Sequence, residues 1–170
     1  MGVPALSPLI KATIFIAALP IFLTQALAKN SIPLATEIAI NMMQYVEWDH
    51  HPSKPHGHAL CILQNKTGMD DEFDMGKLKV ISINDHLLIS DKCDAVLVEK
   101  EFNYLIPAIS LTNNKRNTLI IGLLNNSLSN GAHFSLIREG DTYKIHGNAK
   151  NIKSSRIIIS SKLLRLTKLD

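Results

Sequence analysis

The stretch ALCIL at residues 59–63 is an unbroken apolar run of strand length. Three similar, mostly apolar runs follow it along the chain: KVISI at 79–83, AVLV at 95–98 and TLIIGL at 118–123. A strand that is buried on both faces has such a run instead of an alternating pattern. Strands of this kind belong to sheets covered by helices. The four runs therefore predict an α/β fold, with a mostly parallel (mixed) central sheet flanked by helices.

Helical periodicity surrounds these runs. Residues 33–48 (PLATEIAINMMQYVEW) have apolar side chains at helical spacing, which predicts one helix across the whole segment. Shorter helices are predicted at 69–75, which is acidic, and at 102–111. Pro107 lies inside the last stretch and is unfavourable in a helix interior.

The chain after residue 125 has a different pattern. Residues 133–138 (HFSLIR) and 142–147 (TYKIHG) flank a Glu-Gly-Asp turn and predict an antiparallel hairpin. Residues 149–169 then predict one or two helices. The side chains of this segment that we expect to face the core are Leu163, Leu164 and Leu166.

The first 28 residues have the pattern of a cleavable signal peptide. Lys11 precedes an apolar run of about a dozen residues, whereas spanning a bilayer takes about 20. Ala26-Leu27-Ala28 then provides the small-x-small pattern that signal peptidases cut. We expect residues 29–170 to form one domain outside the cytoplasm. An uncleaved N-terminal anchor is the alternative.

The chain contains two cysteines, Cys61 and Cys93. In an exported protein an even number of cysteines suggests a disulfide. Closing a loop of about 32 residues would stabilise the fold by roughly 3 to 4 kcal/mol in the chain-entropy model. The two residues lack the C-x-x-C spacing of redox enzymes, so we interpret the bond as structural. Two buried thiols are the alternative.

The sequence contains no familiar catalytic motif, because a nucleophile elbow, a phosphate-binding loop and a zinc-binding helix are all missing. The acidic residues Asp70, Asp71, Glu72 and Asp74 include enough carboxylates for a glycosidase pair. Four acids within five residues are more typical of a charged helix start. We therefore predict no catalytic residues and no enzymatic activity.

One loop is rich in histidine. Residues 49–58 contain His50, His51, His56 and His58, and neutral imidazoles close in sequence can converge on zinc or copper. The loop contains no cysteine, however, and no carboxylate apart from Asp49. A solvated loop is the simpler interpretation, so we predict no metal site and no cofactor.

The charge of the chain gives no argument for nucleic-acid binding. The sequence has 18 Lys and Arg residues against 15 Asp and Glu residues, a formal net charge of +3. Nucleic-acid-binding domains usually have a concentrated basic face. The basic residues near the C-terminus are more typical of the solvated side of helices. We therefore predict no nucleic-acid partner.

The end of the first predicted helix combines Met43, Tyr45 and Trp48, the only tryptophan. Aromatic side chains are enriched at protein interfaces, although they also cap a core where a helix meets a loop. Met42 and Met43 are adjacent in the sequence, so we expect only one of the two sides of the helix to face the core. We therefore predict that Met43, Tyr45 and Trp48 contact a partner.

Several segments together resemble the YfiR family of periplasmic regulators. They are a helix ending in YVEW (45–48), the cysteine strand ALCIL, a second cysteine in CDAVLV (93–98), the strand-like TLIIG and the ending ISSKLLRL (159–166). The resemblance in order and spacing runs from about residue 35 to residue 166. The ending is its most specific part.

The resemblance implies a repressor that is not an enzyme. Family members bind the periplasmic sensor region of an inner-membrane diguanylate cyclase and lower cyclic di-GMP synthesis. The resemblance also implies a homodimer and an outer-membrane lipoprotein, of the peptidoglycan-associated type, that sequesters the repressor. Cys61 and Cys93 match one family cysteine pair, whereas a second pair has no counterpart at 125–135. The alternative function is a periplasmic module that binds a small ligand or a metal and has a different receptor.

Overall fold

The computed structural model describes residues 32–48, 57–65, 72–74, 78–89, 93–113 and 117–170. Residues Pro33–Asp170 form one compact unit. The predicted signal peptide and the loop histidines His50, His51 and His56 lie outside the described residues. In the described part of the chain, no helix is long and apolar enough to cross a membrane.

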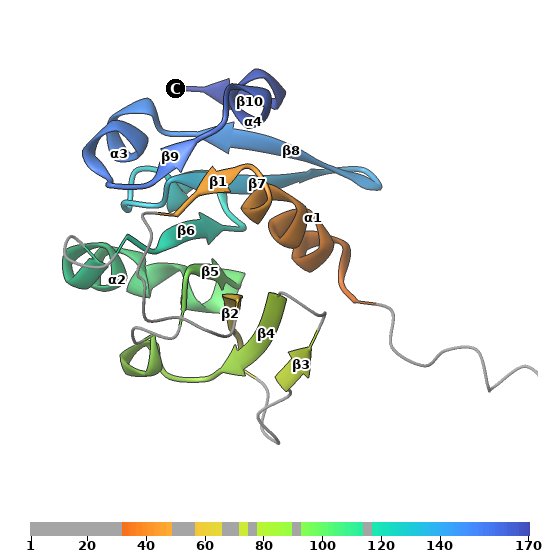
Figure 1. Ribbon diagram of the computed structural model, residues 1–170, viewed down its shortest axis with the longest axis vertical. Helices are drawn as coiled ribbons and strands as arrows, with labels where there is room; N and C mark the ends of the chain where they lie inside the picture. The colour runs from red at the N-terminus through yellow and green to blue at the C-terminus, as the bar shows by residue number, and fades with distance from the viewer. Residues whose placement is uncertain (1–31, 49–56, 66–71, 75–77, 90–92, 114–116) are drawn as a thin grey trace, which may run out of the picture. The chain divides into compact units, whose positions relative to one another are not determined.

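An eight-stranded sheet lies at the centre of this unit, and its strand order is β10-β8-β7-β6-β5-β2-β4-β3 (Figure 1). The strands are β2(His58–Leu63), β3(Glu72–Asp74), β4(Leu78–Ile83), β5(Ala95–Val98), β6(Leu119–Gly122), β7(Phe134–Glu139), β8(Thr142–Gly147) and β10(Thr167–Leu169). Neighbouring strands are parallel except for the pairs β3/β4 and β7/β8. The prediction of a mostly parallel, mixed sheet is confirmed, and the four apolar runs are its central strands.

Alternation along these strands creates two hydrophobic clusters. In β2, Leu60 and Ile62 belong to the larger cluster, while Cys61 and Leu63 belong to the smaller one. Successive side chains of a strand point to opposite faces, so each cluster marks one face of the sheet. The larger cluster includes residues of α1(Leu34–Met43), and the smaller one includes residues of α2(Ile106–Asn113). We call these sides the α1 face and the α2 face.

The first helix is shorter than predicted. α1 ends at Met43, and residues 46–47 instead form β1(Val46–Glu47), which pairs with β9(Ile158–Ile159) in a separate antiparallel sheet. The Ser160 N–H donates to the Tyr45 carbonyl at 2.8 Å, next to this pair. The prediction of a helix through Trp48 was therefore wrong, because a distant segment satisfies backbone groups that the helix would have used.

The acidic segment also differs from its prediction. Residues 72–74 are strand β3, antiparallel to β4, with Phe73 opposite Val80. The helix predicted for residues 69–75 was wrong at these three positions. Pairing with the exposed edge of β4 satisfies backbone groups of both strands, and this tertiary effect outweighs the local helical pattern.

The helix predicted at residues 102–111 is present. A 3₁₀ helix, η2(Lys100–Leu105), runs directly into α2. Pro107 is the second residue of α2, and a proline in the first turn costs little because N–H groups there lack helical partners. Two further 3₁₀ turns are η1(His86–Leu88) and η3(Asn125–Ser127).

In the C-terminal segment the predicted hairpin and helices are confirmed, and two short strands that were not predicted are also present. β7 and β8 pair antiparallel around Gly140, whose φ is 60°. α3(Ala149–Ser154) and α4(Ser161–Leu166) follow, separated by β9, and β10 ends the chain. Leu163 is buried and Leu164 half-buried, but Leu166 is 68% exposed. Leu166 does not face the core as expected, because the chain leaves the helix there to form β10.

Candidate functional site

The structure contains the predicted disulfide between Cys61 and Cys93, with Cα atoms 5.7 Å apart. Cys61 lies in the middle of β2, and Cys93 lies just before β5. Both residues are buried in the cluster on the α2 face. The bond therefore closes a loop that carries β3, β4 and η1, and water has little access to its sulfur atoms.

Hydrogen bonds around Asp94 reinforce this connection. The Asp94 carboxylate accepts from the Ala59 N–H at 2.8 Å, and the Asp94 N–H donates to the Ala59 carbonyl at 2.9 Å. The Asp94 carboxylate also lies 3.8 Å from Nδ1 of His58. The start of β2 is thus attached to the start of β5 immediately beside the disulfide.

His58 is the one residue of the predicted histidine loop group that the structure describes. Its ring centroid lies 5.3 Å from that of Trp48, and its side chain is exposed by about half. Within the described ranges, no group of three or more His, Cys, Asp or Glu residues is placed to hold a metal ion. His58 here has an aromatic and a carboxylate neighbour.

The three residues predicted to contact a partner lie in different environments. Met43 is 5% exposed and belongs to the α1-face cluster, so it is not on the exposed side of the helix as expected. Trp48 is half-buried against the same cluster, and its buried Nε1–H has no acceptor among the described residues. Tyr45 is 36% exposed. Of the three, Tyr45 is the most accessible to another protein.

The turn and two-stranded sheet beside Tyr45 present further exposed side chains. Glu47 and Ile158 lie directly opposite each other in β1 and β9, and Ile158 is 61% exposed. The other pair, Val46 and Ile159, packs into the α1-face cluster. We call Tyr45, Glu47 and Ile158 the Tyr45 surface. Sequence analysis missed Ile158, because residues 149–169 were predicted as helices and not as a short strand with one exposed side.

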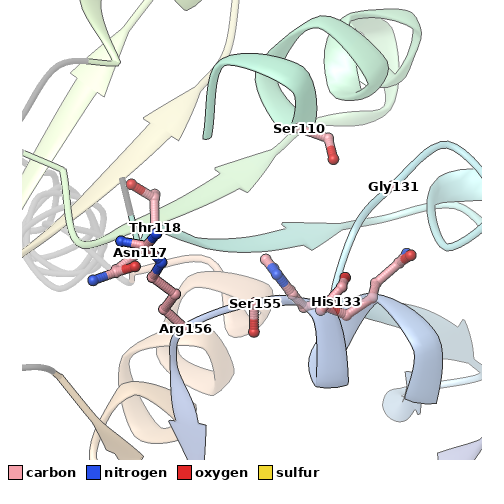
Figure 2. Close-up of a pocket in the computed structure, with 9 residues that line it drawn as sticks. Ser110, Asn117, Thr118, Gly131, His133, Ser155 and Arg156 are labelled. Carbon is pink, nitrogen blue, oxygen red and sulfur yellow. The ribbon is translucent and has the colours of Figure 1, made fainter. Parts of the chain in front are cut away.

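A small polar cavity of about 80 Å³ lies between α2 and α3. Figure 2 shows Ser110 on one side of the opening, with His133, Ser155 and Arg156 on the other. Burial lowers the pKa of His133 to about 4, so its imidazole is neutral at pH 7. The lining residues are scattered between residues 110 and 156, and no sequence motif indicated that they would meet.

Comparisons with known proteins agree with the resemblance. A sequence model of the YfiR/HmsC-like family matches residues 33–168. A search of curated proteins finds no match. The family match covers α1 and the strands and helices after it, as far as β10.

Proposed function

Because the chain belongs to the YfiR/HmsC-like family, we propose that it is a periplasmic repressor of a diguanylate cyclase. In this proposal it binds the periplasmic sensor region of the inner-membrane cyclase and lowers cyclic di-GMP synthesis. The observation that carries the proposal is the family match over residues 33–168. The missing catalytic motifs in the sequence are consistent with a binding protein.

The mechanism that we propose is a population shift. A repressor that binds the inactive conformer of the cyclase more tightly than the active one lowers the active fraction. Changing a 99:1 equilibrium to 1:99 requires a preference of about 10⁴-fold. An outer-membrane lipoprotein of the peptidoglycan-associated type would compete for the repressor and restore the active conformer. We also propose that the repressor acts as a homodimer.

The Tyr45 surface is our candidate for the cyclase contact. Tyrosine is one of the residue types that are enriched among the side chains dominating binding energy at protein interfaces. Tyr45 supplies such a group, Ile158 adds exposed apolar area beside it, and their neighbours Val46 and Ile159 anchor both strands in the core. Residues of this surface are therefore accessible while their backbone is held in place. Met43 is left out of the contact because it is buried.

The test is the cellular cyclic di-GMP concentration after deletion of the gene and complementation. We expect the concentration to rise on deletion and to return to its original value with the wild-type gene. A Tyr45→Ala/Ile158→Ser variant should leave the concentration high, because it removes apolar contact area from the Tyr45 surface. Tyr104→Ala is the matched control, since Tyr104 is an exposed tyrosine in η2 on the other face of the sheet.

Two results would contradict different parts of the proposal. An unchanged cyclic di-GMP concentration after deletion would exclude a repressor of an active cyclase. Full complementation by the double variant would place the contact elsewhere on the protein. Immunoblotting of periplasmic fractions would check that each variant is exported and accumulates like the wild type.

A further inference from the structure

The polar cavity between α2 and α3 is built where two central strands begin. Asn117 and Thr118 precede β6, and His133 precedes β7. Ser110 comes from α2, and Arg156 follows α3 (Figure 2). The chain thus brings polar groups from four separate segments to one small opening. This cavity is separate from the Tyr45 surface, with which it shares no residue.

Part of the cavity wall is held by internal hydrogen bonds. The Thr118 hydroxyl donates to the Cys93 carbonyl at 3.1 Å. The Asn151 amide donates to the carbonyls of Leu128, at 3.0 Å, and Ala132, at 2.8 Å. These bonds satisfy donors on one part of the wall and fix the loop beside it. The cavity is therefore shaped before any ligand binds.

His133 places a largely buried imidazole beside this cavity. Its side chain is almost wholly buried, with the residue 5% exposed. Nδ1 accepts a hydrogen bond from the Ile120 N–H at 3.0 Å, so the neutral ring carries its proton on Nε2. Nε2–H makes no hydrogen bond within the described part of the chain, and Nε2 is not one of its fully buried unpaired atoms. Because His133 lines the cavity, this donor is accessible from the cavity and can donate to an acceptor bound there.

Other donors around the opening are also available. The side chains of Ser110, Asn117 and Arg156 carry hydrogen-bond donors and line the same opening. Among the lining residues that the structure describes there is no Asp or Glu, and the one charged group is the Arg156 guanidinium. A guanidinium presents a planar set of donors that matches the geometry of carboxylate and phosphate groups. The available groups therefore favour an anionic ligand that is rich in acceptors.

We propose that this cavity binds a small oxyanion, the phosphate or carboxylate group of a free ion or small metabolite. Arg156 supplies the charge, and Nε2–H of His133 supplies a donor on a ring that is held in place by its bond to the Ile120 N–H. Ser110 and Asn117 donate from the other sides of the opening. The volume of about 80 Å³ has room for one such group and not for a whole nucleotide. The inference rests on the cavity alone and does not depend on the proposed repressor function.

The experiment is calorimetric titration of the purified protein with inorganic phosphate and, separately, with acetate. Both titrations are made at constant ionic strength in chloride. We expect saturable binding with one site per chain for at least one of the two anions. Tighter binding of phosphate would assign the site to phosphate groups, and tighter binding of acetate would assign it to carboxylates.

Two substitutions test the residues. Arg156→Gln removes the charge from an exposed side chain and should weaken binding at least tenfold. His133→Asn keeps an acceptor for the Ile120 N–H but removes Nε2–H, and should also weaken binding. Lys150→Gln is the matched control, because Lys150 is an exposed cation of α3 that does not line the cavity. It should change the affinity less than twofold.

Three results would overturn the proposal. They are no saturable binding of either anion, equal affinities for the wild type and Arg156→Gln, or equal losses in Arg156→Gln and Lys150→Gln. Circular dichroism spectra confirm beforehand that each variant is folded. The exposed Arg156 ensures that at least one variant reports on binding without disturbing the core.

Discussion

The two faces of the central sheet are stabilised in different ways. The α1 face carries the larger hydrophobic cluster, in which α1 and residues of the C-terminal segment pack on the sheet. The α2 face carries a smaller cluster, and the disulfide lies inside it. Because hydrophobic stabilisation scales with buried apolar area, the smaller cluster contributes less. The comparison indicates that a covalent bond and polar networks supplement packing where the apolar core is small.

The same difference extends to the functional surfaces. The Tyr45 surface lies on strands whose inner side packs into the α1-face cluster. The polar cavity lies instead where β6 and β7 begin, and it is lined by Ser110 of α2, by His133 and by residues of the segment 151–156 in and after α3. The α1 face thus offers an apolar contact, whereas the polar cavity at the start of β6 and β7 offers a site for a small polar ligand.

The largest predicted effect would break the packing of the α1 face. Phe134 is fully buried in that cluster, and Phe134→Ala should lower the free energy of unfolding by about 3 to 5 kcal/mol. Urea denaturation measures this change. Arg138→Ala, at an exposed position of the same strand, should change it by less than about 0.5 kcal/mol. A loss below about 1 kcal/mol for Phe134→Ala would contradict the importance of this cluster.

Removing the disulfide tests the α2 face. The double variant Cys61→Ala/Cys93→Ala should lower the free energy of unfolding by roughly 3 to 4 kcal/mol, since the unfolded chain regains the entropy of a loop of 32 residues. Urea denaturation of the wild type with a reducing agent should give the same value as the double variant without it. If the double variant were as stable as the oxidised wild type, the α2 face would not depend on the covalent bond.

Acid should lower the free energy of unfolding through His133. Its pKa is about 4 when folded, against 6.5 for an ordinary histidine. Below pH 6.5 the unfolded state binds a proton that the folded state excludes. The stability that the neutral His133 contributes is therefore complete above pH 6.5 and is lost as the pH falls toward 4. The expected loss is roughly 3 kcal/mol. Denaturation midpoints across this range should show a smaller pH dependence in His133→Asn, and an identical dependence would refute the assignment.

The smallest effect concerns a buried polar network on the α2 side. The Asn103 amide donates to the Asn126 side-chain oxygen at 3.0 Å, and the Ser127 hydroxyl donates to Asn103 Oδ1. Asn103→Ala leaves buried groups unsatisfied and should cost about 1 to 3 kcal/mol. Asn126→Ala, at an exposed position, should cost less. Equal losses measured by thermal unfolding would mean that burial of the network does not matter.

Part of the candidate site could be predicted from the sequence. The disulfide follows from the even number of cysteines together with the predicted export of the chain. Tyr45 is exposed, as a contact with a partner requires. The position of Met43 could not be predicted in this way. Ile157 and Leu163 belong to the cluster that buries it, and they are more than a hundred residues away in the sequence. Both sides of the end of α1 therefore contribute to the core.

The sequence by itself determined the central strands, the β7/β8 hairpin, the cysteine pair and the family. These features depend on local signals, such as apolar runs of strand length and turn residues. Only the tertiary structure decided the short strands β1, β3, β9 and β10, the burial of Met43 and the polar cavity. A strand of two or three residues is stable only when a partner strand satisfies its backbone groups. Its partner, like the walls of a cavity, comes from distant parts of the chain that meet only on folding.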